Sequence, residues 1–561
     1  MRPWNERPTS LLVHFDTVSG GESQVTVTES TQLTGGRRAA TSRRRTRQDA
    51  SARVPSGLLP QPPDNVEKYS YTRSHLWVLT CFSLLSFGSM VASEVGLLRA
   101  TPWFWLFVPF LAFTVVYYLM SRWVHGFNET FDLKGHRALV RGWRPERYPT
   151  VDVFLPVAGE PIEVLHNTWT HVARLRDQYP GEVTPYVLDD SDSPELAQMA
   201  VDFEFVYGTR NNRGWFKKAG NLQFGFRNSD SDYILILDAD FAPRSDLLDE
   251  LLPYMENDPG LGIVQSPQFF RILDSQNWIE RGAGAVQELF YRTVQVSRQR
   301  NDGAICVGSC ALYRRAALEQ NGGTTLIEHS EDVHTGFDLR RLGWNLHYVP
   351  IALAAGVCPD NVGGFFNQQY RWCTGSMSLL GSRKFWGTKL RLITRMCYMS
   401  GFFYYIHTAL FTIVSPLVPI VLLLMRPDLI RWENTMLVIP GLVYATLIFP
   451  LWHRNPYRLE AWAARMMYGW AHVFAIWDIL RKNRMAWQPT GSSGAKKNKT
   501  RRFWTGMIVW GGGTAALWVG AGIWRMLTMG PLNFALVLAS GLFYAVIVGR
   551  VLVQPRPTEA V

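Results

Sequence analysis

The chain has 561 residues, which is too long for one ordinary domain. Its hydrophobic content of 47% is ordinary for a soluble protein, so the distribution of apolar residues, rather than their total, must indicate the class of protein. The net charge of +11 is concentrated in an N-terminal arm and beside apolar blocks. Basic residues in these places are typical of the cytoplasmic flanks of membrane spans, and we favour that interpretation over nucleic-acid binding.

The chain begins with a polar segment, residues 1–70, that is rich in Ser, Thr and Arg. This composition predicts a disordered basic arm and no secretory signal peptide. The six cysteines form no paired CxxC signature. A reduced, cytosolic setting for the central region therefore fits better than a disulfide framework.

Apolar blocks near both ends are long enough to cross a membrane. A transmembrane helix requires roughly 20 mainly apolar residues. The blocks that fit this length are 76–97, 102–123, 401–425, 435–452, 504–526 and 531–552. We therefore predict about six transmembrane helices, two before and four after a central region with interspersed charges.

The charges beside the spans predict their orientation. The N-terminal arm and the stretches 124–146 and 481–502 are strongly basic, whereas 98–101 and 527–530 carry little charge. By the positive-inside rule, the N terminus, the C terminus and the central domain are expected in the cytosol, and the protein in the plasma membrane. The short connection 426–434, with two arginines, mildly opposes this orientation.

Residues 457–484 contain many aromatic residues separated by charges. This pattern predicts an amphipathic helix that lies on the membrane surface, packs against the central domain, or does both. The predicted organisation of the chain is 1–70 arm, 71–125 two spans, 126–385 cytosolic catalytic domain, 386–456 interfacial segment and two spans, 457–503 amphipathic helix and loop, and 504–552 two spans.

In the central region, apolar strands alternate with helical stretches. Three strands run directly into carboxylates: VDVFLPVAGEP at 151–161, YVLDDSDSPE at 186–195 and YILILDADF at 233–241. The alternation predicts an α/β domain with a mixed, mainly parallel sheet. Ligands of such sheets bind beyond the carboxyl ends of the strands, so the acids there are candidates for one site. They are Glu160, Asp189, Asp190, Asp238 and Asp240.

Asp238 and Asp240 indicate a specific chemistry. Two carboxylates at the mouth of a buried strand repel each other unless a positive charge lies close to both. Mg²⁺ or Mn²⁺ bridged to a diphosphate would supply that charge and would neutralise a leaving nucleoside diphosphate. The triplet alone is weak evidence, because DxD sequences also cap helices. Capping is likewise the alternative for Asp189 and Asp190, which precede a helix expected at Pro194.

Two further segments supply candidate groups. Lys218, in KKAGN, is a point charge suited to phosphate, although a solvated lysine is its simplest interpretation alone. Glu331 and Asp332 precede a helical pattern in HSEDVHTGF, residues 329–337. Inverting sugar transfer needs a base beside the acceptor hydroxyl, and we assign that role to Asp332. The alternative is a carboxylate that merely stabilises the helix N-terminus.

The segment QQYRWCTGS, residues 368–376, adds Gln368, Arg371 and Trp372. A tryptophan face can stack on a sugar ring, and an arginine can reach a phosphate group. An ordinary amphipathic helix would explain the same pattern without any ligand.

The DD, KAGN, DxD, ED and QxxRW segments follow one another in this order between apolar blocks. As an ordered set they resemble the processive glycosyltransferase family 2, and within it the cellulose synthases and cellulose synthase-like proteins. The resemblance covers about 75–552. It implies an α/β GT-A type catalytic domain inserted in an α-helical transmembrane bundle of about six helices.

The resemblance further implies a function. The expected enzyme is a UDP-sugar-dependent hexosyltransferase that polymerises a β-linked polysaccharide and translocates it, with UDP-glucose and a β-1,4- or mixed β-1,3/1,4-glucan favoured. Asp332 would be the catalytic base with Glu331 beside it, and Asp238 and Asp240 would hold a divalent cation, Mg²⁺ or Mn²⁺. The substrate-binding residues would be Asp189, Asp190, Glu160, Lys218, Asp238, Arg371, Gln368, Trp372, Cys310 and Thr490.

Two positions depart from the family pattern, and several alternatives stay open. Ser330 replaces the threonine of the TED motif, and the gating-type loop at 487–492 keeps Thr490 but lacks the lysine that should follow. The alternatives are a hyaluronan- or chitin-synthase-like polymerase using UDP-GlcNAc, an enzyme that glycosylates a lipid carrier, and a non-catalytic polysaccharide channel or scaffold. A homo-oligomer or an accessory protein is a further open expectation.

Overall fold

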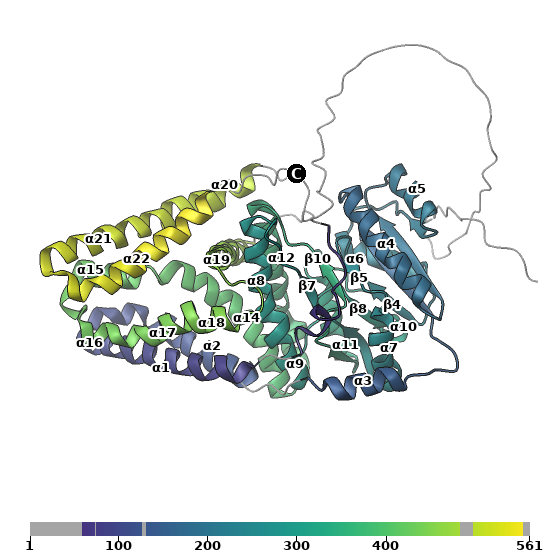
Figure 1. The fold of residues 1–561 in the computed structure, drawn as a ribbon, viewed down its shortest axis with the longest axis horizontal. Helices are drawn as coiled ribbons and strands as arrows, with labels where there is room; N and C mark the ends of the chain where they lie inside the picture. Colours follow the sequence, from purple (N-terminus) through teal and green to yellow (C-terminus); the bar gives the residue numbers. More distant parts are fainter. Residues whose placement is uncertain (1–58, 73–74, 126–130, 483–496, 554–561) are drawn as a thin grey trace, which may run out of the picture.

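The computed structural model describes residues 59–72, 75–125, 131–482 and 497–553. Within these residues an α/β domain lies beside a bundle of long helices (Figure 1). Three helices stand between the two parts: α8 (Trp278–Leu289), α12 (Val362–Leu380) and α19 (Leu459–Leu480). The predicted N-terminal arm up to residue 58 and the gating-type loop at 487–492 lie outside the described residues.

A seven-stranded sheet in the order β3-β2-β1-β4-β8-β6-β9 forms the core of the domain. Only β8 runs antiparallel to its neighbours β4 and β6, while the other described pairs are parallel, as the sequence predicts. The strand bounds are β1 (Val151–Val157), β2 (Val183–Asp189), β3 (Val206–Gly208), β4 (Tyr233–Ile236), β6 (Leu261–Gln265), β8 (Ala311–Arg314) and β9 (Asn345–Tyr348).

The central strands are buried on both faces, because helices cover the sheet. All residues of β1 and β4 are buried, which is why their sequences are nearly continuous apolar runs. The helices of the domain are α3 (Leu133–Gly142), α4 (Ile162–Gln178), α5 (Pro194–Asp202), α6 (Lys217–Arg227), α7 (Leu247–Asn257), α9 (Gln295–Arg300), α10 (Arg315–Asn321) and α11 (Glu331–Arg341). A small second sheet, β5-β10-β7, joins β5 (Ala242–Pro243), β10 (Ala354–Gly356) and β7 (Gln268–Phe270).

Among the described residues, six helical segments are long and apolar enough to cross a membrane, in agreement with the predicted number. Their bounds are Leu76–Ala100, Phe104–His125, Leu392–Met425, Trp432–Trp452, Arg501–Met529 and Pro531–Leu552. The third segment is divided at Pro416 into α14 (Leu392–Val414) and α15 (Leu417–Met425), because proline has no N–H for the helical hydrogen bond. The protein is a multi-pass membrane protein.

The aromatic-rich segment after the fourth span forms α19, which packs against α12, α8 and α14. Small side chains make the approach possible, since Ala461, Ala463 and Ala464 are buried. A Cβ atom on Gly282 of α8 would lie 2.4 Å from the carbonyl oxygen of Glu460. Of the two expectations for this segment, packing against the central domain is the one seen; α19 links that domain to the helical bundle.

Residues 59–70 correct the prediction of a disordered arm that extends to residue 70. Lys68 is only 4% exposed and forms an ion pair with Asp246 at 2.7 Å and another with Glu250. Glu67 accepts a hydrogen bond from Nε of Arg271 at 2.7 Å. These partners lie far along the chain, so the polar composition of 59–70 gave no indication of them. This segment holds the start of α1 (Leu76–Ala100) close to the α/β domain.

Candidate active site

The acids that follow β1, β2 and β4 come together because these strands are neighbours in the sheet. They face a cavity of about 1900 Å³. The sequence-predicted residues that line this cavity are Glu160, Asp190, Lys218, Asp238, Asp240, Glu331, Asp332, Gln368, Arg371 and Trp372. Burial raises the pKa of Glu160. The hydrogen bond that its carboxylate accepts from the Ala158 amide acts in the opposite direction but does not outweigh burial.

Asp189 and Asp190 have different surroundings although they are adjacent. The Asp189 side chain is fully buried, and its carboxylate accepts hydrogen bonds from the Ser191 amide and hydroxyl, the Ser193 amide and the Tyr207 hydroxyl, at 2.6–2.9 Å. It does not line the cavity, whereas Asp190 does. Helix α5 is capped by Ser193, so the capping alternative for the two acids is wrong. Asp189 holds the loop that presents Asp190.

Arg210 is a site residue that the sequence reasoning missed. It is 3% exposed, and its Nε and Nη2 atoms donate to the two carboxylate oxygens of Asp190 at 2.7 and 2.6 Å. It also donates to the carbonyl oxygens of Trp215 and Lys217 at 2.8 and 3.1 Å. One guanidinium thus connects the acid after β2 to the turn that begins α6. Its position eight residues before KAGN was the only signal, and it was not distinctive.

Lys218 joins three elements of the site from the first turn of α6. Its ammonium group forms an ion pair with Asp238, donates to the Gly308 carbonyl oxygen at 2.8 Å and lies 3.8 Å from Glu331. Burial acts to lower the pKa of Lys218, but Asp238 and Glu331 outweigh it and raise that pKa. The lysine therefore stays protonated and supplies a fixed positive charge among carboxylates, which a solvated lysine would not do.

The negative charges of Asp238 and Asp240 are not fully neutralised by the positive groups around them. Burial, and then the charge of Asp238, raise the pKa of Asp240 to about 7. Among the described residues, no group of three or more His, Cys, Asp or Glu side chains could hold a metal ion by itself. The two carboxylates fit a cation that takes its remaining oxygen ligands from a bound diphosphate.

Asp332 lies in the first turn of α11, opposite the turn that contains Gly308. A Cβ atom on Gly308 would lie 2.7 Å from Oδ2 of Asp332, so the carboxylate occupies the space of a missing side chain. Burial, followed by the charge of Glu331, raises the pKa of Asp332 to about 7, with Lys218 acting in the opposite direction. A carboxyl group with such a pKa can take up a proton near neutral pH.

Replacing Gly308 with alanine should displace Asp332. The new methyl group would force the carboxylate away, and for the base role expected of Asp332 such a displacement costs about 100-fold in rate. Gly322→Ala is the matched control, because Gly322 has the same φ of +76° but nothing within 4 Å of its Cβ position. Turnover of the UDP-sugar by the two variants is the measurement. If the two variants lose turnover to the same extent, backbone strain and not the contact with Asp332 is the cause. If neither variant loses turnover, the prediction is wrong.

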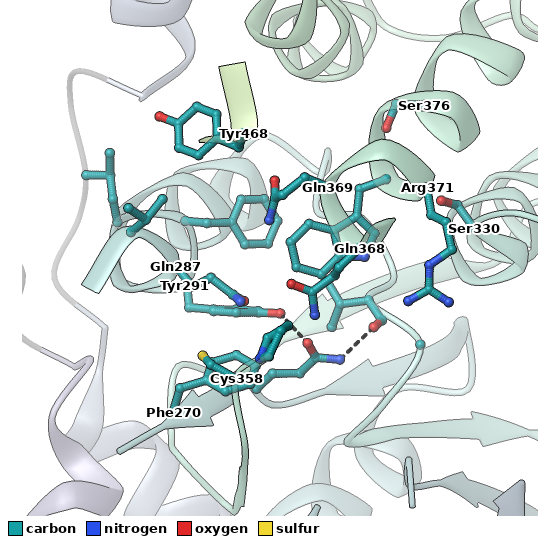
Figure 2. A pocket seen from close by; sticks show the side chains of 18 of the residues that line it. Phe270, Gln287, Tyr291, Ser330, Cys358, Gln368, Gln369, Arg371, Ser376 and Tyr468 are labelled. Atoms are coloured by element: carbon teal, nitrogen blue, oxygen red, sulfur yellow. Dashed lines mark hydrogen bonds between the residues drawn. The ribbon is translucent and has the colours of Figure 1, made fainter. Parts of the chain in front are cut away.

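Helix α12 carries the QxxRW residues to the same cavity. Burial lowers the pKa of Arg371, while the charges of Glu331, Asp238 and Asp332 act to raise it, which locates the guanidinium near those acids. Figure 2 shows Arg371 near Ser330, with Gln368 and Gln369 farther along the cavity wall. The glycine after the motif is also required for space, since a Cβ on Gly375 would lie 2.0 Å from the Ser330 hydroxyl oxygen.

Besides Asp189, two further predicted substrate-binding residues are not seen at the cavity. Cys310 has no exposed surface and belongs to the hydrophobic core, while its neighbours Cys306, Val307 and Gly308 line the cavity. Thr490 lies outside the described residues. All six cysteines are free thiols.

The cavity continues from the acids into the helical bundle. Its wall there consists of residues from α2 (Val108–His125), α14 and α19, among them Tyr117, Tyr404, Tyr405, Phe411, Trp462 and Tyr468. Aromatic faces of this kind stack on sugar rings. One continuous space thus joins a cluster of carboxylates to an aromatic passage between membrane-type helices.

A family model described as glycosyl transferase family group 2 matches residues 233–451. The matched segment contains Asp238, Asp240, Asp332 and the QxxRW helix. The α/β domain from β4 onward therefore matches a glycosyltransferase family model. The predicted GT-A type fold class, with a mainly parallel sheet beside a bundle of six apolar helices, is confirmed by the strand order and by this match.

Curated relatives narrow the family. The cellulose synthase catalytic subunit of Komagataeibacter sucrofermentans is 30% identical over 347 residues, which is 60% of this chain and 44% of the relative. Cellulose synthase 1 of Komagataeibacter xylinus is 33% identical over 261 residues, 46% of this chain and 17% of the relative. The chain is thus similar to the cellulose synthases of glycosyltransferase family 2, and it spans less than half the length of these relatives.

A solved structure with a similar fold is the mannosyltransferase PcManGT of Pyrobaculum calidifontis, in complex with GDP-Man and Mn²⁺. It is 14% identical, with a TM-score of 0.46, and the match covers 66% of this chain and 98% of that one.

Proposed function

We propose that the protein is a processive, inverting glycosyltransferase that polymerises a β-linked polysaccharide from a UDP-sugar and moves the product across the membrane. UDP-glucose, giving a β-1,4- or mixed β-1,3/1,4-glucan, is the favoured substrate. One observation carries the proposal: a single cavity joins the Lys218 and carboxylate cluster to an aromatic passage between the helices. The orientation that follows has the catalytic domain and both termini in the cytosol.

In this proposal, the nucleotide lies over the ends of β2, β1 and β4. Asp190 faces the uridine and ribose, and Lys218 and Arg371 face the diphosphate. Asp238 and Asp240 would hold Mg²⁺ or Mn²⁺, and the bound cation would neutralise the charge of the leaving UDP. The positive groups are already in place before the reaction, so their stabilisation of the developing charge costs little reorganisation.

Asp332 serves as the base for the acceptor hydroxyl. It takes the proton while the hydroxyl oxygen attacks the anomeric carbon from the side opposite UDP, so that an α-linked donor gives a β-linked product. The terminal sugar stacks on Trp372 and is held by Gln368, both of which line the cavity. The lengthened chain then advances into the aromatic passage.

The raised pKa of Asp332 predicts an acid limb in the rate profile. The base form is present above about pH 7 and is lost as the pH falls through that value. At a saturating concentration of Mg²⁺, kcat/KM is expected to fall about tenfold per pH unit below this pKa. Rates from about pH 5.5 to about pH 8.5 check the expectation, and a flat profile over that range would contradict it.

The proposed function is tested with purified protein and three labelled donors, UDP-glucose, UDP-GlcNAc and UDP-glucuronate. Incorporation into polymer, followed by digestion with linkage-specific hydrolases, identifies the sugar and the linkage. Polymer from UDP-GlcNAc alone would favour the hyaluronan- or chitin-synthase-like alternative. No release of UDP from any donor, with or without Mg²⁺ and Mn²⁺, would favour the channel or scaffold.

A further inference from the structure

Helix α8 contributes a glutamine to the cavity that none of the sequence motifs includes. Gln287 is 7% exposed and lines the cavity, and its Nε2 atom has no hydrogen-bond partner among the described residues. A buried donor without a partner is costly and therefore rare in folded proteins. The position of this amide in a cavity wall indicates that a ligand completes its hydrogen bonding.

Gln368 on α12 offers the complementary atom. Its Oε1 also finds no partner in the described part of the chain, and the side chain lines the same cavity. Figure 2 shows Gln287, Gln368 and Gln369 around one space, beside Tyr291. The two glutamines thus present one unused donor and one unused acceptor.

A sugar hydroxyl matches this pair, because it donates one hydrogen bond and accepts others. Such a hydroxyl donates to an acceptor such as Oε1 of Gln368 and accepts from a donor such as Nε2 of Gln287. A carboxylate only accepts, and would leave Oε1 of Gln368 facing another acceptor.

Gln268 shows that an unused amide is not a general property of this wall. Its amide group donates to the Val307 carbonyl oxygen at 2.9 Å, and its Oε1 accepts from the Tyr291 hydroxyl at 2.9 Å. Gln268 is therefore satisfied within the protein and holds Tyr291 in place. Gln287 and Gln368, in contrast, keep their hydrogen-bonding capacity for a ligand.

We propose that Gln287 and Gln368 form a subsite for a hydroxyl group of an uncharged hexose unit in the growing chain. The inference rests on the proposed polymerase function, and it adds Gln287 as a residue that selects the acceptor. The subsite favours a polymer with a free hydroxyl at this point over one with a carboxylate there.

The test compares Gln287→Met with Gln198→Met in full-length protein. Methionine has nearly the volume of glutamine but no amide, and Gln198 is an exposed residue of α5 far from the cavity lining. The donor is whichever labelled UDP-sugar the wild type polymerises. The measured quantity is the amount of sugar in polymer per UDP released, together with the affinity for UDP.

In Gln287→Met, loss of one hydrogen bond to the acceptor is expected to lower the polymer yield per UDP about tenfold, while the affinity for UDP stays that of the wild type. The Gln198→Met variant should equal the wild type in both measurements. A yield equal to that of the wild type would overturn the subsite. A parallel loss of UDP affinity would also overturn it, because that result indicates a general structural role. Failure of the wild type to release UDP would instead refute the proposed function, so the two failures are distinguishable.

Discussion

Replacing Asp332 with asparagine is expected to lower sugar transfer by about 10²- to 10⁴-fold, the usual contribution of a general base. Asparagine keeps the shape of the side chain but cannot take the acceptor proton. The half-buried carboxylate lies against Gly308, and an amide of the same shape leaves that packing intact. UDP binding should be retained, because Lys218 and Asp238 are unchanged. Release of UDP and binding of UDP by the purified variant are the two measurements.

Asp177→Asn is the control for this prediction. The Asp177 side chain is 65% exposed at the end of α4, and its ion pair with Arg176 is a surface contact of small energy. Transfer by this variant should equal that of the wild type. Wild-type transfer by Asp332→Asn would refute the assignment of the base, and simultaneous loss of UDP binding would indicate that the site had collapsed.

The elements whose burial is decided locally could be predicted from the sequence. The apolar runs of β1 and β4 and the six long apolar segments have a pattern that only a covered strand or a membrane-type helix requires. The segment 59–70 could not be predicted in this way. Its stability depends on ion pairs with Asp246, Glu250 and Arg271, which come from elements more than 170 residues away.

Part of the candidate site could also be predicted from the sequence. The acids after three neighbouring strands come together because the ends of parallel strands share one edge. It was not predictable that Asp189 is buried while Asp190 lines the cavity. Successive residues of a strand point to opposite sides, and the sequence does not say which side is the interior. Arg210 and Gln287 were missed for another reason: each acts through a partner that only the folded chain brings close.

Arg210→Met is expected to be strongly destabilising. The bidentate ion pair with Asp190 is buried, with 3% and 11% of the two side chains exposed. Removing one partner leaves a buried charge uncompensated, which costs about 3 kcal/mol or more of the free energy of unfolding. Thermal unfolding in detergent measures this loss, and a variant as stable as the wild type would contradict the prediction.

The double variant Arg210→Met, Asp190→Leu separates the two roles of this pair. With both charges replaced by apolar groups, much of the stability should return, because no unpaired charge remains. UDP affinity should not return, since Asp190 faces the cavity and Arg210 also holds the carbonyl groups of Trp215 and Lys217 before Lys218. Arg210→Lys keeps the charge but lacks the planar fork, so it should be intermediate in both measurements. Recovery of UDP affinity in the double variant would show that the pair only stabilises the fold, whereas its absence would show that the pair is also needed for nucleotide binding.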